Sequence, residues 1–152
     1  MPTMCVFNGN AIAGGYILGL CHDFRIMHET NGGICLSEAK LGLPLPYPYN
    51  RVCAAKLDAM TANKLFMAID VKQQEALKDN LIDATYSGPE DLAAQIAAFG
   101  KRYANLGAQR MAIHMNKLNQ FEDVIVVCKS WTFAPPLDAV FRQYHGILAK
   151  QL

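Results

Sequence analysis

An apolar segment with two adjacent glycines constrains the fold of this chain more than any other feature. It runs from residue 8 to residue 27 and has the sequence NGNAIAGGYILGLCHDFRIM. Between Gly14 and Cys21 the apolar side chains go most of the way round a helix, so the sequence predicts a short buried helix. The glycine pair stands at the head of this helix, although a helical glycine costs about 1 kcal/mol relative to alanine. We therefore expect the backbone itself to have a function at this point.

Short strands are predicted on both sides of this helix. Residues 3–7 are apolar and β-branched and end at an Asn-Gly turn, which is typical of a buried strand. Residues 23–27 alternate polar and apolar side chains, and residues 34–37 form another apolar run after a glycine-containing turn. A helix and several strands in such close succession indicate an α/β fold.

The rest of the chain is predicted to be mainly helical. Residues 38–50 contain prolines at positions 44, 46 and 48 and are predicted to form a loop. Ser87 and Glu90 have the spacing of a capping box, and Pro89 suits the first turn of a helix. Helical patterns occur over residues 51–62, 61–68, 71–83, 87–118, 121–128 and 137–148. The composition of residues 121–128 also fits a strand, but the helical rhythm that follows favours a helix.

The composition excludes several classes of function. The 152 residues suffice for one compact domain, and a net charge of +1 creates no field that attracts nucleic acid or an anionic membrane. No apolar run reaches the roughly 18 residues of a membrane-spanning helix. A hydrophobic fraction of 52% with a charged fraction of 18% favours buried subunit contacts. The cysteines form no C-x-x-C pair and are predicted to be small buried residues in a reducing compartment: Cys5, Cys21, Cys35, Cys53 and Cys128.

The glycine pair is the first candidate functional feature. Free N–H groups at a helix N-terminus, together with the helix dipole, favour negative charge. At Gly14 no side chain hinders a carbonyl oxygen that approaches the N–H group, and one such donor contributes about 3–4 kcal/mol to a transition state that develops an oxyanion. The pattern alone also fits a second interpretation, in which Gly14 and Gly15 only allow the helix to pack tightly against a strand.

Glu38 is the second candidate. It follows an apolar strand, and the neighbouring Leu36, Leu41 and Leu43 predict apolar surroundings. Burial favours the neutral form of a carboxylate and makes it a stronger base in proton transfer. A solvent-exposed glutamate in the first turn of a helix is the alternative.

Two further pairs of side chains leave alternatives open. His22 beside Asp23 fits a metal-binding or acid–base pair, but a contact between His22 and the C-terminal end of the preceding helix is favoured. Tyr47 and Tyr49 lie in the proline-rich segment, where they either line an acyl pocket or cover the core.

The order of these features resembles that of the crotonase superfamily, the enoyl-CoA hydratases and isomerases. NGNAIAGGYILGLCHDFRIM resembles the family's strand, glycine-rich turn, helix and D-x-R-I strand, and LSEAKLGLPLP resembles its acidic strand-end loop. AIDVKQQEALKDNLID is similar to the family pattern G-x-x-x-x-A-x-E-A-x-x-x-G-L-V-D. The resemblance extends over residues 4–83 and implies a crotonase-like spiral core, incomplete at its N-terminus, in residues 1–86. A helical oligomerisation region is then expected in residues 87–152.

The resemblance implies a reaction on coenzyme A thioesters. The Gly14 N–H corresponds to one of two donors that stabilise a thioester enolate, and Glu38 corresponds to the catalytic carboxylate of the strand-end loop. Family hydratases place a second glutamate where this chain has Ile17, so the resemblance favours the single-base Δ3,Δ2-enoyl-CoA isomerases. The substrate is expected to contact Ala13, Gly15, Ile17, Leu36 and Leu43. No metal or separate cofactor is implied, because coenzyme A is part of the substrate.

Most members of the family carry further residues before the segment equivalent to Met4, and these hold the first strands and the other donor. The resemblance therefore implies an N-terminally truncated member, for which two functions stay open. The chain is either an isomerase completed by another part, or a catalytically inactive structural subunit of a larger assembly. In both cases a homo- or hetero-oligomer is expected to cover the edge of the first strand. Acyl-CoA chemistry and unpaired cysteines favour the mitochondrial matrix, with the peroxisome as the alternative.

Overall fold

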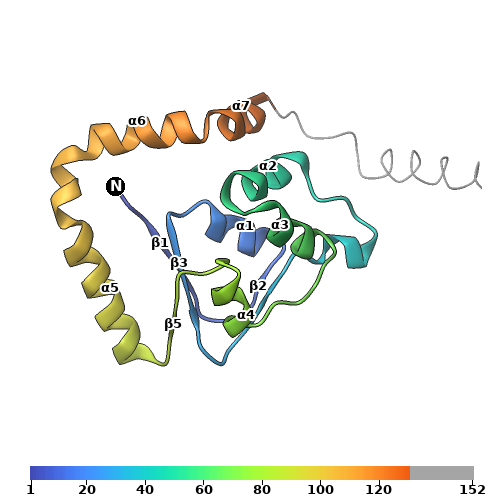
Figure 1. The fold of residues 1–152 in the computed structure, drawn as a ribbon, viewed down its shortest axis with the longest axis horizontal. Helices are drawn as coiled ribbons and strands as arrows, with labels where there is room; N and C mark the ends of the chain where they lie inside the picture. The colour runs from blue at the N-terminus through green and yellow to red at the C-terminus, as the bar shows by residue number, and fades with distance from the viewer. Residues whose placement is uncertain (131–152) are drawn as a thin grey trace, which may run out of the picture.

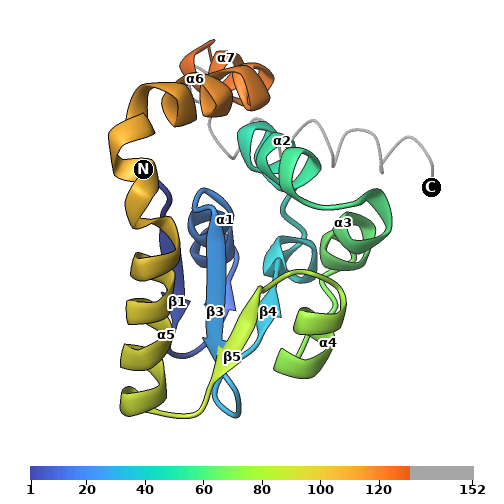
Figure 2. The ribbon, with the colours of Figure 1, turned by 60° about the vertical axis from the view of Figure 1, so that its left-hand side comes forward.

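Two small parallel sheets form the centre of the computed structural model, which describes residues 1–130. The first sheet has the order β1-β3-β5 and consists of β1 (Met4–Phe7), β3 (Phe24–His28) and β5 (Ala84–Tyr86). The second sheet pairs β2 (Ala11–Ile12) with β4 (Ile34–Cys35). Figure 2 shows β3 between β1 and β5, with helices around them. The prediction of an α/β fold is confirmed.

Helix α1 (Gly14–Leu20) packs against both sheets, and the predicted burial holds on one face only, because Leu18 is 64% exposed. The side chains of Tyr16, Ile17 and Leu20 are at most 4% exposed. A Cβ atom at Gly19 would overlap the ring of Phe7, so only glycine allows α1 to lie this close to β1. The buried Tyr16 hydroxyl donates a hydrogen bond of 3.1 Å to the Leu81 carbonyl, which ties α1 to the segment before β5.

Four helical elements connect β4 to β5. They are the 3₁₀ helix η1 (Ser37–Leu41) and the α-helices α2 (Tyr47–Lys56), α3 (Ala59–Phe66) and α4 (Gln73–Lys78). The loop predicted over residues 38–50 is wrong at both ends, because η1 occupies its start and α2 begins at Tyr47. Pro48 lies in the first turn of α2, where no backbone N–H group is needed.

The helix predicted over residues 51–62 is two helices, because Asp58 caps a new one. Its carboxylate accepts hydrogen bonds of 3.0 Å from the N–H groups of Met60 and Thr61 at the start of α3. An aspartate in extended conformation with these two contacts ends one helical path and begins the next.

A helical arm follows β5. It consists of α5 (Pro89–Tyr103), the 3₁₀ helix η2 (Ala104–Gln109), α6 (Arg110–Gln120) and α7 (Glu122–Ser130). Figures 1 and 2 show α5 alongside β1, and α6 and α7 turning across one end of the molecule toward α2. The ring of Phe24 on β3 lies 5.2 Å from the ring centres of both Phe99 and Tyr103, which holds α5 against the sheet.

The arm confirms some predicted helices and corrects others. The helix favoured over residues 121–128 is confirmed as α7. The continuous helix predicted over residues 87–118 is interrupted by η2, which contains Gly107, a poor helix former. The capping box is wrong, because Gly88 is the N-cap and the Ser87 N–H donates to the carboxylate of Asp91, at 2.9 Å, rather than to Glu90. The helix predicted over residues 137–148 lies outside the described residues.

The cysteines divide into two groups. All five are free, and Cys35 and Cys53 are buried as predicted, while Cys5 is partly buried. Cys21 and Cys128 are exposed, so the prediction of burial is wrong for these two. Both lie at or near helix C-termini, where the chain meets solvent.

Candidate functional site

Glu38 lies in the wall of a cavity of about 300 Å³. The cavity is bounded by η1, the loop that follows it, α2 and α3, and its other lining residues are Leu36, Ala39, Leu43, Pro44, Leu45, Asn50 and Phe66. One carboxylate oxygen of Glu38, Oε2, is buried, and no group in residues 1–130 donates a hydrogen bond to it. The structure thus brings the predicted residues Leu36, Glu38 and Leu43 together around one mainly apolar space.

The backbone after β4 turns back on itself to place Glu38 there. Leu36 is extended, and Gly42 ends η1 with φ of 68°, in the left-handed region that favours glycine. The N–H of Leu43 donates a hydrogen bond of 3.0 Å to the carbonyl of Glu38. This turn puts the two lining residues Glu38 and Leu43 on the same side of the loop.

The electrostatics around the cavity leave the Glu38 carboxylate without a positive partner. Lys40 pairs with Asp70 at 2.6 Å, and no ion pair to Glu38 occurs in the part of the chain that the structure describes. Burial raises the pKa of the Cys53 thiol to about 12, and the nearby charge of Glu38 adds to this effect. Because the thiol stays protonated at neutral pH, Glu38 is the base that this region offers.

Gly14 begins α1 directly after a strained turn. Ala13 has φ of 51° and ψ of −127°, which is the conformation of the first central residue of a type II′ turn, a position that favours glycine. The Ala13 N–H donates to the Cys35 carbonyl at 2.8 Å, and the Ala13 carbonyl accepts from the N–H of Tyr16. No backbone acceptor within residues 1–130 takes the Gly14 N–H, since the first N–H groups of a helix have no partner inside it.

Packing within residues 1–130 does not explain the glycine pair. A Cβ atom at Gly15 would meet no atom of the described residues within 4 Å, and one at Gly14 would make only ordinary contact, at 3.8 Å, with the hydroxyl of Tyr49. Gly19, by contrast, is required by its contact with Phe7. The interpretation of Gly14 and Gly15 as packing residues therefore loses its main support, while the approach to the Gly14 N–H stays free of a side chain of its own.

The predicted site residues do not all meet at the cavity. Ala13, Gly14 and Gly15 are not among its lining residues, and Ile17 packs in the core at 4% exposure. A contact between the Ile17 side chain and a substrate in this cavity therefore has no support in the structure.

Sequence reasoning missed two residues that line this cavity, Asn50 and Phe66, and left the place of Tyr49 open between an acyl pocket and a cover of the core. Asn50 and Phe66 line the cavity from α2 and α3, and Tyr49 lies over Gly14. Tyr47, on the same helix turn, is 58% exposed. The signal that could have found Asn50 and Tyr49 is Pro48, because a proline in a first helical turn predicts a helix that begins near residue 47.

The His22–Asp23 pair is used for structural contacts. The Asp23 carboxylate accepts hydrogen bonds from the Thr3 N–H and from Lys117 Nζ, both at 2.6 Å. The His22 carbonyl accepts from Lys56 Nζ at 3.0 Å, whereas its ring Nδ1 is buried without a partner in residues 1–130. Across those residues, no three metal-ligating side chains of His, Cys, Asp or Glu form a cluster. None of the helices described is both long and apolar enough to cross a bilayer.

Comparison with curated proteins gives relatives of a single kind. Arabidopsis thaliana enoyl-CoA delta isomerase 2, peroxisomal, is 30% identical over 107 residues, which are 68% of this chain and 45% of that protein. Enoyl-CoA delta isomerase 1, peroxisomal, from the same plant is 25% identical over 109 residues, which are 70% of this chain and 45% of that protein. The chain thus spans about half the length of the curated relatives it matches.

Solved structures share the fold. An Mtb enoyl-CoA isomerase superimposes with a TM-score of 0.70 and 23% identity, over 80% of this chain and 53% of that one. An enoyl-CoA hydratase from Mycobacterium ulcerans gives a TM-score of 0.73 with 22% identity, over 85% and 55%. The sequence model of the enoyl-CoA hydratase/isomerase family matches residues 1–124, which is most of the chain. The chain belongs to the enoyl-CoA hydratase/isomerase family of the crotonase superfamily.

Proposed function

We propose that this chain carries the base of a Δ3,Δ2-enoyl-CoA isomerase site. One observation carries the proposal: Glu38 lines a mainly apolar cavity, and its buried carboxylate oxygen Oε2 has no hydrogen-bond donor in residues 1–130. An apolar acyl chain suits such a lining, and an unpaired carboxylate is free to accept a proton. The names of the Arabidopsis relatives, enoyl-CoA delta isomerases, support the same reaction.

The proposed reaction is a transfer of one proton within the acyl chain. Glu38 takes the proton from C2 of a 3-enoyl thioester, and the electrons of the C2–H bond form an enolate that extends over the thioester carbonyl. The Gly14 N–H donates a hydrogen bond to the enolate oxygen. Glu38 then returns the proton to C4, and the double bond lies between C2 and C3. The atoms of reactant and product are the same, so the step requires no cofactor besides the coenzyme A of the substrate.

An isomerase is proposed rather than a hydratase because, within residues 1–130, Glu38 is the one carboxylate that lines the cavity. Adding water across a double bond uses one group to activate the water and another to deliver a proton. The structure places Ile17, the position of the second glutamate in family hydratases, in the apolar core. In an isomerase, Glu38 alone can remove the proton from C2 and return it to C4.

The test is turnover of a 3-enoyl-CoA by the purified chain, followed by the ultraviolet absorbance of the conjugated 2-enoyl thioester. Glu38→Gln keeps the shape of the side chain and removes the base, so kcat is expected to fall at least about 100-fold. Glu29→Gln is the matched control, because Glu29 is an exposed glutamate in the turn after β3 and its loss leaves kcat unchanged.

A second candidate, a catalytically inactive structural subunit, is favoured by the position of Gly14, which is not among the described residues that line the cavity of Glu38. It predicts no turnover by the chain under any assay condition and co-purification with a fixed partner. Wild-type turnover by the Glu38→Gln variant would contradict the isomerase proposal in a different way. Another base would then remove the C2 proton.

We also propose a peroxisomal location, because two of the Arabidopsis relatives carry that word in their names. The mitochondrial matrix stays a prediction that the relatives do not support. Microscopy of the fluorescently tagged full chain decides between the two compartments.

A further inference from the structure

The Tyr49 side chain, at the start of α2, lies beside Gly14, the residue that carries the proposed oxyanion donor. A Cβ atom on Gly14 would be 3.8 Å from the hydroxyl oxygen of Tyr49 and 4.0 Å from its ring atom Cε2. We propose that the Tyr49 hydroxyl is a catalytic hydrogen-bond donor that acts with the Gly14 N–H on the oxygen of the bound thioester. This inference rests on the proposed isomerase function.

The first turn of α2 links the two halves of the site. Asn50, the residue after Tyr49, lines the cavity of Glu38, and Cys53 is buried close enough to feel the charge of Glu38. Residues four apart share a face of a helix, so Tyr49 lies on the same face of α2 as Cys53. The first turn of α2 therefore places Tyr49 beside Gly14 and Asn50 at the cavity of Glu38.

The hydroxyl of Tyr49 is available for a ligand. It forms no hydrogen bond within residues 1–130, although the hydroxyls of Tyr16 and Tyr86 donate to the backbone carbonyls of Leu81 and Phe7. The Tyr49 side chain is 37% exposed, so an incoming carbonyl group reaches it from solvent. A phenol supplies one O–H donor, and an enolate oxygen accepts more than the single hydrogen bond that Gly14 offers.

The role assigned to Tyr49 is electrostatic. When Glu38 takes the C2 proton, negative charge develops on the thioester oxygen, which accepts hydrogen bonds from the Gly14 N–H and the Tyr49 O–H. The phenolic proton stays on Tyr49 throughout, and the only proton that moves travels from C2 to Glu38 and on to C4. The charge disappears from the oxygen when C4 is protonated.

The first experiment compares Tyr49→Phe with Tyr47→Phe. Both variants remove one phenolic hydroxyl from the same helix turn. Tyr47, however, is 58% exposed, and none of its atoms is among those nearest to a Cβ atom at Gly14. We expect Tyr49→Phe to lower kcat for 3-enoyl-CoA about 100-fold, as the loss of one oxyanion donor does, with KM changed less than about twofold. Tyr47→Phe keeps the wild-type kcat, and both variants keep the wild-type melting temperature.

A second readout separates this inference from the isomerase proposal. Acetoacetyl-CoA enolises at C2, and its bound enolate absorbs in the near ultraviolet, so the enolate fraction reports oxyanion stabilisation without turnover. Wild type is expected to raise this fraction, and Tyr49→Phe to lower it at least about tenfold at saturating ligand.

Turnover and enolate absorbance together distinguish the role of Tyr49 from the isomerase proposal. A Tyr49→Phe variant with wild-type kcat and wild-type enolate absorbance overturns the role of Tyr49, while loss of turnover in Glu38→Gln keeps the isomerase proposal. Enolate absorbance that depends on Tyr49 in a chain without turnover supports Tyr49 and overturns the isomerase. A chain that neither turns over 3-enoyl-CoA nor binds acetoacetyl-CoA overturns both.

Discussion

Ile17 lies one helical turn beyond Gly14, in the interior of the molecule. Its side chain is 4% exposed and belongs to the core cluster that also contains Phe7 and Leu20. A carboxylate here would lose its water without gaining a partner, since the surrounding side chains are apolar. The proposed site would therefore keep a single carboxylate because of the packing of α1, and we expect that one substitution does not convert it to a two-carboxylate site.

Ile17→Glu is expected to destabilise the chain by about 3 kcal/mol and to add no hydratase activity, because it buries an unpaired polar group. Ile17→Val is the control, at a cost of about 1 kcal/mol for one lost methylene. Urea unfolding measures both variants, and hydration of a 2-enoyl-CoA is assayed alongside. An Ile17→Glu variant with the wild-type midpoint and measurable hydration would refute this view of the core.

Single residues of the site differ in how far the sequence predicts them. Gly14 and Glu38 stand out because each sits at the junction of a predicted strand or helix, within a motif of fixed order. Asn50 and Phe66 belong to no such motif, because their place at the cavity depends on how α2 and α3 pack over η1. Contacts between segments far apart in the sequence leave no periodic pattern of apolar residues, so they cannot be predicted from such a pattern.

At the scale of elements, the turn into α1 is where the backbone is strained. Ala13 adopts φ of 51° and ψ of −127°, a region that an alanine enters only at a cost of about 1–3 kcal/mol. The surrounding hydrogen bonds hold it there, since its N–H donates to Cys35 and its carbonyl caps α1. As a result, the first N–H groups of α1, those of Gly14 and Gly15, have no backbone acceptor within residues 1–130.

Ala13→Gly is expected to relieve this strain. Glycine loses more chain entropy on folding, by about 0.5–1 kcal/mol, so the net gain is about 1 kcal/mol, or about 2–4 °C in Tm. Ala54→Gly, in the exposed middle of α2, is the matched control and is expected to lose about 1 kcal/mol. Thermal unfolding followed by circular dichroism checks both, and equal losses in the two variants would show that Ala13 is unstrained.

Elements with a strong local pattern follow the sequence-based predictions. The segments β1, α1 and β3 lie where their apolar patterns place them, to within one residue at each end. The start of α2, the division at Asp58 and the interruption at η2 do not, because caps and single prolines or glycines decide them. The ends of these helices depend on one or two hydrogen bonds. The periodic pattern of apolar side chains carries no information about such hydrogen bonds.

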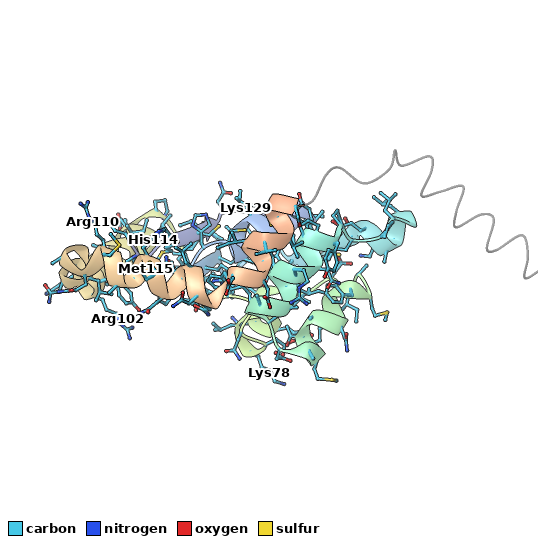
Figure 3. All side chains as sticks on the ribbon, turned by 90° about the horizontal axis from the view of Figure 1, so that it is seen from above. Lys78, Arg102, Arg110, His114, Met115 and Lys129 are labelled. Carbon is cyan, nitrogen blue, oxygen red and sulfur yellow. The ribbon has the colours of Figure 1, made fainter. Side chains whose placement is uncertain are left out.

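At the scale of the whole molecule, the helical arm leaves much apolar surface uncovered. Packing within residues 1–130 buries no residue of helices α5, α6 and α7. Met111 and Met115, one turn apart on α6, are 70% and 47% exposed. Figure 3 shows Met115 on α6, between Arg110 at the start of this helix and Lys129 near the end of α7. Such an apolar helix face favours association with another chain.

The oligomer prediction is tested by replacing both methionines. Met111→Glu with Met115→Glu is expected to shift the chain to a smaller species in light scattering during gel filtration, without a loss of Tm, because neither side chain is in the core. Lys78→Glu on α4 changes the net charge by the same amount away from the arm and serves as the control. A wild-type chain that elutes as a monomer would disprove association through α6.

The overlap that a side chain at Gly19 would make with the ring of Phe7 has a consequence at the other end of α1. Because the ring occupies the groove left by the missing side chain, the helix can neither slide along β1 nor rotate on it. Seven residues span about 10 Å. In the proposed site, the position of the first turn of α1, and with it that of the Gly14 N–H, is thus set by an aromatic ring on β1.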